Sequence, residues 1–178
     1  DEREARLAEQ YRLQGVVRFG DIEKEKVGKY CPSYLEMQEI GLKAGDIVRE
    51  RGLVRALDYG QQMHLEARDQ IRRVTEMLQD KGIREIHAEL PLLNGEKRGF
   101  IVKGTSQVDV IELLGDGRTV CIYDYKTGRA RFTDDDMIRY AGEGGAYAAN
   151  KGFDPAHMNV YVFPIFIPDM FGRDFNRR

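Results

Sequence analysis

The chain has 178 residues, of which 42% are hydrophobic and 33% are charged, values typical of a globular domain rather than a disordered chain. No apolar run is long enough to cross a bilayer, which excludes a membrane-spanning segment. The formal net charge of −2 excludes a protein that binds a polyanion over its whole surface, so such a partner would need a local basic patch.

The two cysteines, Cys31 and Cys121, lie far apart in the sequence. They cannot by themselves provide the four ligands of a structural zinc or iron–sulfur site, and one disulfide does not make a scaffold. Because free cysteines are commonly buried as small apolar residues, we expect both to be ordinary free thiols.

The first eighty or so residues have the pattern of helices. Residues 1–14, rich in Glu, Arg, Ala and Leu, predict the first one. A second helix begins after Pro32, where Ser33 and Glu36 have the spacing of a capping box. It is expected to end at 45–46 or slightly beyond.

A third helix covers about 54–81 and ends at Lys81-Gly82, a C-terminal stop signal. Its apolar stripe advances in steps of three and four through Leu53, Leu57, Gly60, His64, Ala67, Ile71, Val74 and Leu78. His64 is therefore expected to point inward, either as a core residue or as a ligand.

The period then changes to that of strands. The strand predicted over 86–92 has one apolar face, made of Ile86, Ala88, Leu90 and Leu92, with His87 and Glu89 on the other. Asn94-Gly95 predicts a hairpin turn, and 99–103 the return strand.

Two more strands, a helix and a last strand are predicted over 108–114, 119–126, 133–150 and 159–167. Thr133 begins the helix with Asp136 as its capping partner, and the acids at 134–136 suit the helix dipole rather than a metal. Pro164 suits a sheet edge. This order predicts an α/β fold in which a central mixed β-sheet is flanked by helices, with a helical N-terminal region.

Three carboxylates and a lysine are the candidate residues for chemistry. Asp124 and Lys126 lie on one face of their strand because side chains alternate along it. An isolated Asp-x-Lys at a strand end is usually a surface ion pair. Here, however, Asp109 and Glu89 also lie inside apolar strands, where an uncompensated carboxylate is costly to bury. A cation, Mg²⁺ or Mn²⁺, would compensate all three acids, since these ions prefer oxygen ligands.

Several motifs occur in a fixed order along the chain: Gly60-x-x-x-His64, Glu89, Asp109 and the string Asp124-Tyr125-Lys126-Thr127-Gly128. Together, over about 60–165, they resemble the motifs of RecB-like PD-(D/E)XK nucleases. The resemblance implies a restriction-endonuclease-like fold, with Asp109 and Asp124 as metal ligands and Lys126 as the catalytic lysine. Glu89 would match the upstream acid of the family, and His64 the histidine that contacts metal or substrate.

The sequence departs from this family pattern in two places. The family often has a Gly a few residues before the first Asp. Here the nearest is Gly104, and four residues separate it from Asp109. The expected Gln-x-x-x-Tyr has Glu143 in place of Gln, which leaves Tyr147 as either a substrate contact or a core residue.

Substrate phosphates are expected to contact Arg129 and Arg131, with Tyr147 nearby and Arg98 as a further candidate. A basic tail of Arg173, Arg177 and Arg178 is either part of this grip or a solvated surface.

We expect a single domain over 1–178, in which 1–82 form a helical wall and 83–178 the catalytic sheet core. The expected function is divalent-metal-dependent hydrolysis of DNA, with no membrane partner. The alternatives are a catalytically silent nucleic-acid-binding or scaffold domain of the same fold, and a ribonuclease.

The chain begins with Asp1 instead of Met, so we expect a piece of a longer polypeptide. By analogy, this favours an antibacterial effector or toxin domain with an immunity protein as partner. Its location would then be the cytoplasm, reached directly or by secretion and delivery into a target cell.

Overall fold

The computed structural model describes residues 2, 16–18, 26–52, 55–79, 82–93, 95–97 and 106–175. The predicted helix over 1–14 (apart from residue 2), the return strand over 99–103, and Gly104, Arg98, Arg177 and Arg178 lie outside them. The strands are β1 (Val16–Arg18), β2 (Ile83–Leu93), β3 (Glu96–Lys97), β4 (Ser106–Leu114), β5 (Thr119–Thr127) and β6 (Asn159–Ile167). The helices are α2 (Val27–Tyr30), α3 (Tyr34–Glu50), α4 (Ala56–Gln79), α5 (Asp134–Asn150) and the short 3₁₀ helix η2 (Pro155–His157).

The six strands form one mixed sheet in the order β1-β6-β5-β4-β2-β3. β1, β6 and β5 are parallel neighbours, whereas β5, β4, β2 and β3 are successively antiparallel. The predicted α/β fold with a mixed central sheet is therefore confirmed. Within the described residues, no helix is both long and apolar enough to cross a membrane.

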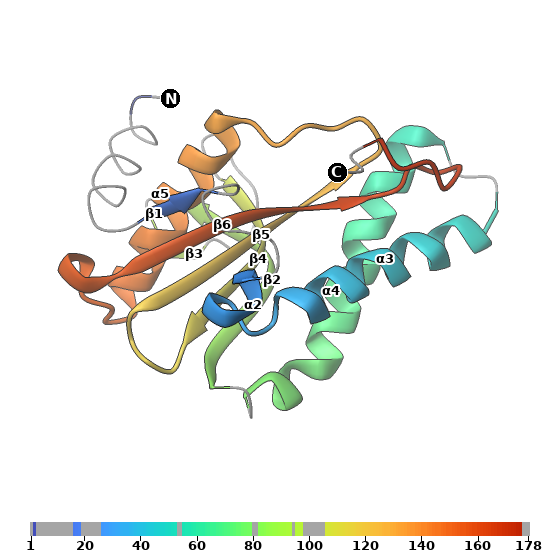
Figure 1. Ribbon diagram of the computed structural model, residues 1–178. Coiled ribbons are helices and arrows are strands. Elements are labelled where there is room, and N and C mark those ends of the chain that lie inside the picture. Colours follow the sequence, from blue (N-terminus) through green and yellow to red (C-terminus); the bar gives the residue numbers. More distant parts are fainter. Residues whose placement is uncertain are drawn as a thin grey trace.

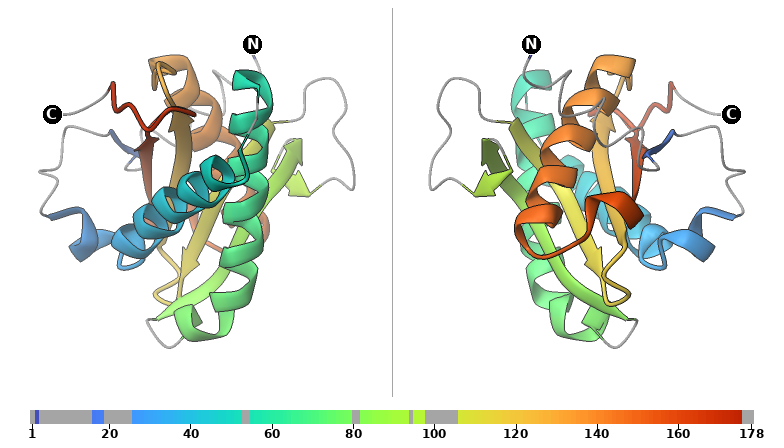
Figure 2. Two further views of the ribbon diagram at one scale, coloured as in Figure 1. Left: turned by 90° about the vertical axis from the view of Figure 1, so that its right-hand side faces the viewer. Right: turned by 90° about the vertical axis from the view of Figure 1, so that its left-hand side faces the viewer.

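Helices cover both faces of the sheet, as Figures 1 and 2 show. On β5, Cys121, Tyr123 and Tyr125 pack in the core beneath α2, α3 and α4. The alternate residues Val120 and Ile122 pack in a second core beneath α5. The alternation predicted for β5 therefore decides which residues meet which helix layer.

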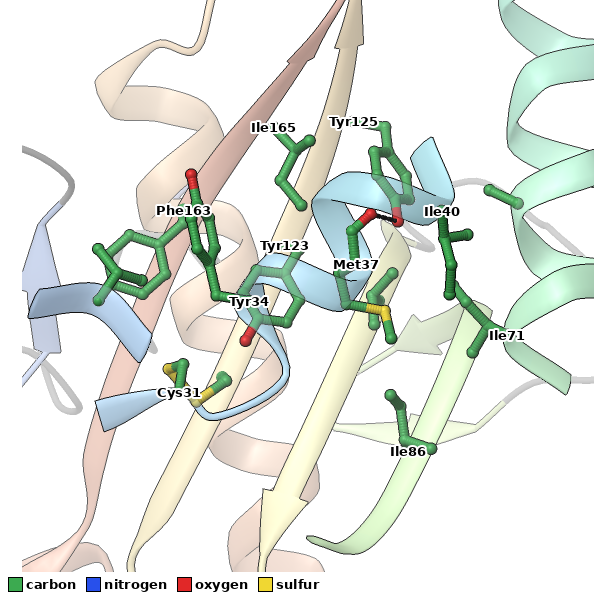
Figure 3. Packing of buried hydrophobic residues seen from close by; sticks show 14 of the residues in the cluster. Cys31, Tyr34, Met37, Ile40, Ile71, Ile86, Tyr123, Tyr125, Phe163 and Ile165 are labelled. Carbon is green, nitrogen blue, oxygen red and sulfur yellow. Dashed lines mark hydrogen bonds between the residues drawn. A yellow bond between two sulfur atoms is a disulfide. The ribbon is translucent and has the colours of Figure 1, made fainter. Parts of the chain in front are cut away.

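Aromatic rings fill the core under α3 (Figure 3). The ring of Tyr34 lies 6.0 Å from those of both Tyr123 and Phe163, separations at which aromatic pairs attract. The Tyr125 hydroxyl donates a 2.7 Å hydrogen bond to the carbonyl of Met37 on α3. These contacts fix α3 across the end of β5.

The two cysteines form a disulfide, so the expectation of free thiols is wrong. Cys31, directly after α2, is bonded to Cys121 near the start of β5, and both residues are fully buried. The bond spans 90 residues of sequence. The close approach of α2 to β5 depends on tertiary packing, which sequence spacing does not show.

Two predicted helix caps have different outcomes. At the start of α5 the capping box is confirmed, because Thr133 and Asp136 exchange hydrogen bonds between side chain and backbone. At the start of α3 it is wrong, since the Ser33 side chain makes no capping bond and is fully buried. Spacing alone does not orient the hydroxyl towards the helix end.

The predicted single apolar face of β2 is also wrong. Ile86 and Ala88 pack in the core under α3 and α4, but Leu90 and Leu92 pack in the core under α5. The strand changes face at Glu89, whose φ of 55° makes it the one described non-glycine residue with positive φ. Such backbone is strained and concentrates at functional sites.

The predicted hairpin turn is confirmed, because Leu93 pairs with Glu96. The described return strand is β3, which begins at Glu96, ahead of the predicted 99–103. Pro164 lies in β6, which has β1 on one side and β5 on the other in the sheet order. β1 is a strand that no local pattern predicts, and it pairs with Val160–Val162 of β6. Pro164 pairs with Asp124 of β5.

Candidate metal centre

The ladder between β4 and β5 opens at the predicted acids. It runs from Leu113 opposite Val120 to Val110 opposite Tyr123, where the backbone pairing ends. Beyond that point the carboxylate of Asp109 accepts a 2.7 Å hydrogen bond from the backbone N–H of Tyr125. In a regular ladder this N–H would donate to a backbone carbonyl of the neighbouring strand, but here it donates to a carboxylate. The place where the pairing of β4 and β5 ends is called the fork below.

His64 lies at this fork and contacts acceptors with both ring nitrogens. Nδ1 is 2.8 Å from the carbonyl of Gly60, and Nε2 is 3.1 Å from Oδ2 of Asp109 and 3.2 Å from the carbonyl of Tyr125. Burial alone would lower the pKa of His64, but the charge and hydrogen bond of Asp109, aided by Glu89, raise it to about 10. The metal-free site therefore favours an imidazolium.

The spacing Gly60-x-x-x-His64 has a structural reason. One helical turn places the Gly60 carbonyl beside the His64 ring. A Cβ at position 60 would lie 3.3 Å from Oγ1 of Thr127. A small residue at position 60 thus lets α4 approach the end of β5 and brings the ring to the fork.

Glu89 joins the same group from β2. Suitable ligand atoms of His64, Glu89 and Asp109 all lie within 4.8 Å of one another. Burial and the neighbouring charge of Asp109 raise the pKa of Glu89 to about 7, and the side chain of Gln107 donates a hydrogen bond to it. The strained backbone at Glu89 thus accompanies a side chain that is costly to ionise.

Asp124 completes the fork from β5 and is 3% exposed. Burial and the neighbouring charge of Asp109 raise the pKa of Asp124 to about 8. Burial also acts on Asp109, but His64 and the other hydrogen bonds outweigh it and hold the pKa of Asp109 below its usual value. Of the two, Asp109 is therefore the stronger acid in the metal-free site.

Lys126 lies beside Asp124, as their shared strand face predicts. Its Nζ is 3.1 Å from Oδ2 of Asp124 and 3.3 Å from Oδ2 of Asp136. Burial would lower the pKa of Lys126, but these two carboxylates raise it, so the ammonium is held charged between β5 and the first turn of α5.

These donors could hold a divalent cation. The carboxylates of Glu89 and Asp109 converge with the imidazole of His64, and Asp124 lies beside Asp109. Glu89 and Asp124 have strongly raised pKa values. A cation would remove the reason for that rise, because an opposite charge favours the ionised form. An oxygen-rich donor set of this kind fits Mg²⁺ or Mn²⁺.

Other predicted residues lie elsewhere. Tyr147 is buried and donates a 2.6 Å hydrogen bond to Glu85. Glu143 is fully buried and accepts a 2.8 Å bond from the N–H of Gly95 in the hairpin turn. These contacts of α5 are structural, and the structure does not bring Tyr147 to the carboxylates of the fork.

The predicted arginines follow β5 directly and are exposed. The guanidinium of Arg129 lies over the ring of Phe175, 4.2 Å from its centroid. Arg131 makes no ion pair with another described residue. Both side chains lie at the surface.

Two residues at the site were not selected from the sequence. Asp136 was assigned to helix capping alone, yet it also binds Lys126. Tyr140 is buried near the fork, and its pKa is raised by burial and then by the charges of Asp124 and Asp109. The i, i+4 spacing from Asp136 would have placed Tyr140 on the same helix face.

Comparison of the chain with protein-family models, curated proteins and solved structures finds no match.

Proposed function

We propose that this protein is a divalent-metal-dependent nuclease that hydrolyses the phosphodiester bonds of DNA. The observation that carries the proposal is the fork between β4 and β5, where the buried Asp109 lies close enough to the buried Asp124 for its charge to raise the pKa of Asp124, and Lys126 is held 3.1 Å from Asp124. The motif resemblance to PD-(D/E)XK nucleases supports the same assignment.

Asp109, Asp124 and Glu89 would hold the metal, with His64 beside them. A bound divalent cation would polarise the phosphate and lower the pKa of a water. Each residue of the chain then has a separate task. His64 orients Asp109, since its Nε2 contacts Oδ2 of that carboxylate. Lys126 presents a charged ammonium that can orient the attacking water and neutralise the charge developing on the phosphate.

Asp136 acts through Lys126. The helix cap fixes Asp136 at the start of α5, and its carboxylate holds Nζ from the side opposite the strand. A positioned ammonium loses less energy to reorganisation when the phosphate charge develops. Asp136 is therefore a positioning residue and does not itself touch the substrate.

The activity test uses the whole chain with supercoiled plasmid, linear duplex DNA and RNA, each with Mg²⁺, Mn²⁺ or EDTA. We expect cleavage of DNA with a metal and none in EDTA. Cleavage of RNA alone would favour the ribonuclease alternative. Binding without cleavage under every condition would favour the catalytically silent alternative.

A role as a secreted antibacterial toxin domain is the finer part of this proposal. Disulfides are typical of proteins that pass through an oxidising compartment, and Cys31–Cys121 is such a bond. Expression of the wild-type chain inside bacteria should then degrade their DNA, whereas Asp124→Ala should be harmless. An immunity protein would be the matching partner. Normal growth with intact chromosomes would contradict the toxin role.

A further inference from the structure

A row of alternating arginines and phenylalanines, here called the Arg–Phe row, lies beyond the end of β5. It consists of Arg129, Phe175, Arg173 and Phe171. The guanidinium of Arg129 is 4.2 Å from the Phe175 ring centroid, and that of Arg173 is 5.3 Å from Phe175 and 5.1 Å from Phe171. Each cation therefore lies within the range of cation–π attraction.

The Arg–Phe row is open to solvent. Phe171 is 71% exposed and Phe175 is 37% exposed. Two neighbouring exposed rings are unusual on a globular surface and often mark a binding site. Arg173 is paired with Asp169, at 2.8 Å, but Arg129 has no carboxylate partner among the described residues.

The row borders a cavity of about 290 Å³ that begins where the candidate metal centre ends. Thr127 and Gly128, which line the cavity, directly follow Lys126 in β5. Tyr59 also lines it, and the next residue, Gly60, accepts the hydrogen bond of His64. The cavity and the fork thus share the same short segments of α4 and β5.

Arginine and aromatic faces in alternation have a specific chemical complement. Unpaired bases stack on aromatic rings, and the phosphates between them attract guanidinium groups. In a duplex the bases are already stacked on one another and offer the protein only their edges. The surface therefore suits a single strand better than a double helix.

We propose that the Arg–Phe row binds a single-stranded segment of DNA and leads it to the fork. Phe171 and Phe175 stack on successive bases, while Arg129 and Arg173 neutralise phosphates. The inference rests on the proposed function, because it names the form of DNA that the nuclease site receives. It also explains how a chain of net charge −2 can bind a polyanion through one local patch.

The test measures binding without cleavage, by fluorescence anisotropy in EDTA, with a labelled 20-nucleotide single strand and a duplex of the same length. The wild-type protein should bind the single strand more tightly. Phe171→Ala and Phe175→Ala should each weaken single-strand binding about fivefold or more, as expected for loss of one stacked base. Arg129→Ala should also reduce the salt dependence of log K by about 0.7.

The control variants replace one exposed apolar residue and one exposed arginine that lie elsewhere. Leu35, 64% exposed, is in the first turn of α3, and Arg72 is exposed on α4, twelve residues from Gly60. Leu35→Ala and Arg72→Ala should bind the single strand as the wild type does. Thermal melts of all five variants check that each remains folded.

Equal affinity of the wild type and both phenylalanine variants for the single strand would overturn the inference, as would tighter binding of the duplex. These outcomes are independent of the nuclease assay. If the protein cleaves DNA and the phenylalanine variants bind the single strand as the wild type does, the role of the Arg–Phe row is rejected and the nuclease function is retained. Phenylalanine-dependent binding without cleavage in any metal would reject the nuclease and retain the row.

Discussion

The two ends of the β4–β5 ladder differ in almost every physical respect. At one end, Leu113 pairs with Val120, and the neighbouring Cys121 is bonded to Cys31. At the other end the pairing stops, and the Asp109 carboxylate accepts the Tyr125 N–H. The first end is covalently fixed and mostly apolar, with the buried Glu112 opposite Cys121. The second end collects several carboxylates in a buried place.

The difference shows how one pair of strands can provide both stability and a reactive site. Apolar burial and the disulfide favour the folded state at the closed end. At the fork, burial and mutual repulsion raise the pKa values of Glu89 and Asp124, which makes their ionised forms costly. Active sites commonly trade stability in this way.

The largest expected effect is at the closed end. Replacing both cysteines, as Cys31→Ala with Cys121→Ala, should lower the free energy of unfolding by about 4 kcal/mol, because a bond across 90 residues strongly restricts the unfolded chain. Urea unfolding measures the change. The folded fraction should keep the DNA cleavage rate of the wild type. Equal unfolding midpoints for the variant and the oxidised wild type would contradict the stabilising role of the bond.

At the fork, the effect should be on activity. Lys126→Ala should lower the rate of metal-dependent cleavage about a hundredfold to a thousandfold, since it removes the charge that neutralises the transition state. Lys43→Ala, which removes an exposed lysine of α3, is the control and should cleave at the wild-type rate. Single-turnover kinetics compare the two. A Lys126→Ala variant with the rate of its control would place the chemistry elsewhere.

The smallest expected effect is on stability, and it is a gain, whereas most substitutions lower stability. Asp124→Asn should stabilise the metal-free protein at pH 8 by about 1 kcal/mol or more, because a pKa change of one corresponds to about 1.4 kcal/mol. The pKa of Asp124 is about 8 in the folded protein and 3.8 as its ordinary value. Its ionisation therefore costs stability progressively as pH rises between these values. Thermal melts in EDTA at pH 4 and pH 8 should show the gain only at pH 8.

Asp116, in the turn at the closed end, is the matched comparison. Burial would raise the pKa of Asp116, but hydrogen bonds from Thr119 and Arg118 hold it below the usual value. Its ionised form is thus favoured by folding, and Asp116→Asn should lower the melting temperature at pH 8. If both asparagine variants were destabilised alike, the acids of the fork would be structural ion pairs like any other.

Local patterns predict most of the secondary structure. The strands over 108–114, 119–126 and 159–167 are found with small changes at their ends, because alternation is a property of neighbouring residues. The face change at Glu89, the strand β1 and the disulfide are not predicted. Each depends on contacts between segments far apart in sequence, which no local pattern records.

The candidate site is predicted only in part, because some of its contacts also join segments that lie far apart in the sequence. Strand alternation correctly places Asp124 and Lys126 side by side. The convergence of His64 and Glu89 on Asp109 was inferred from the motif order, and the fork supplies its geometry. Sequence spacing does not predict that Tyr147 contacts Glu85. Helical periodicity fixes the face of the helix on which a residue lies, but not its position along the sheet.

Binding of Mn²⁺ tests the central claim most directly, namely that the open end of the ladder is a metal site. Electron paramagnetic resonance of free Mn²⁺, titrated with protein, counts the bound ions without any substrate. The wild type should bind Mn²⁺, and Asp109→Ala should weaken that binding at least about tenfold, since Asp109 contacts or neighbours every other proposed ligand. Asp116→Asn should bind as the wild type does. Unchanged Mn²⁺ affinity in Asp109→Ala, or no binding by the wild type, would contradict the account.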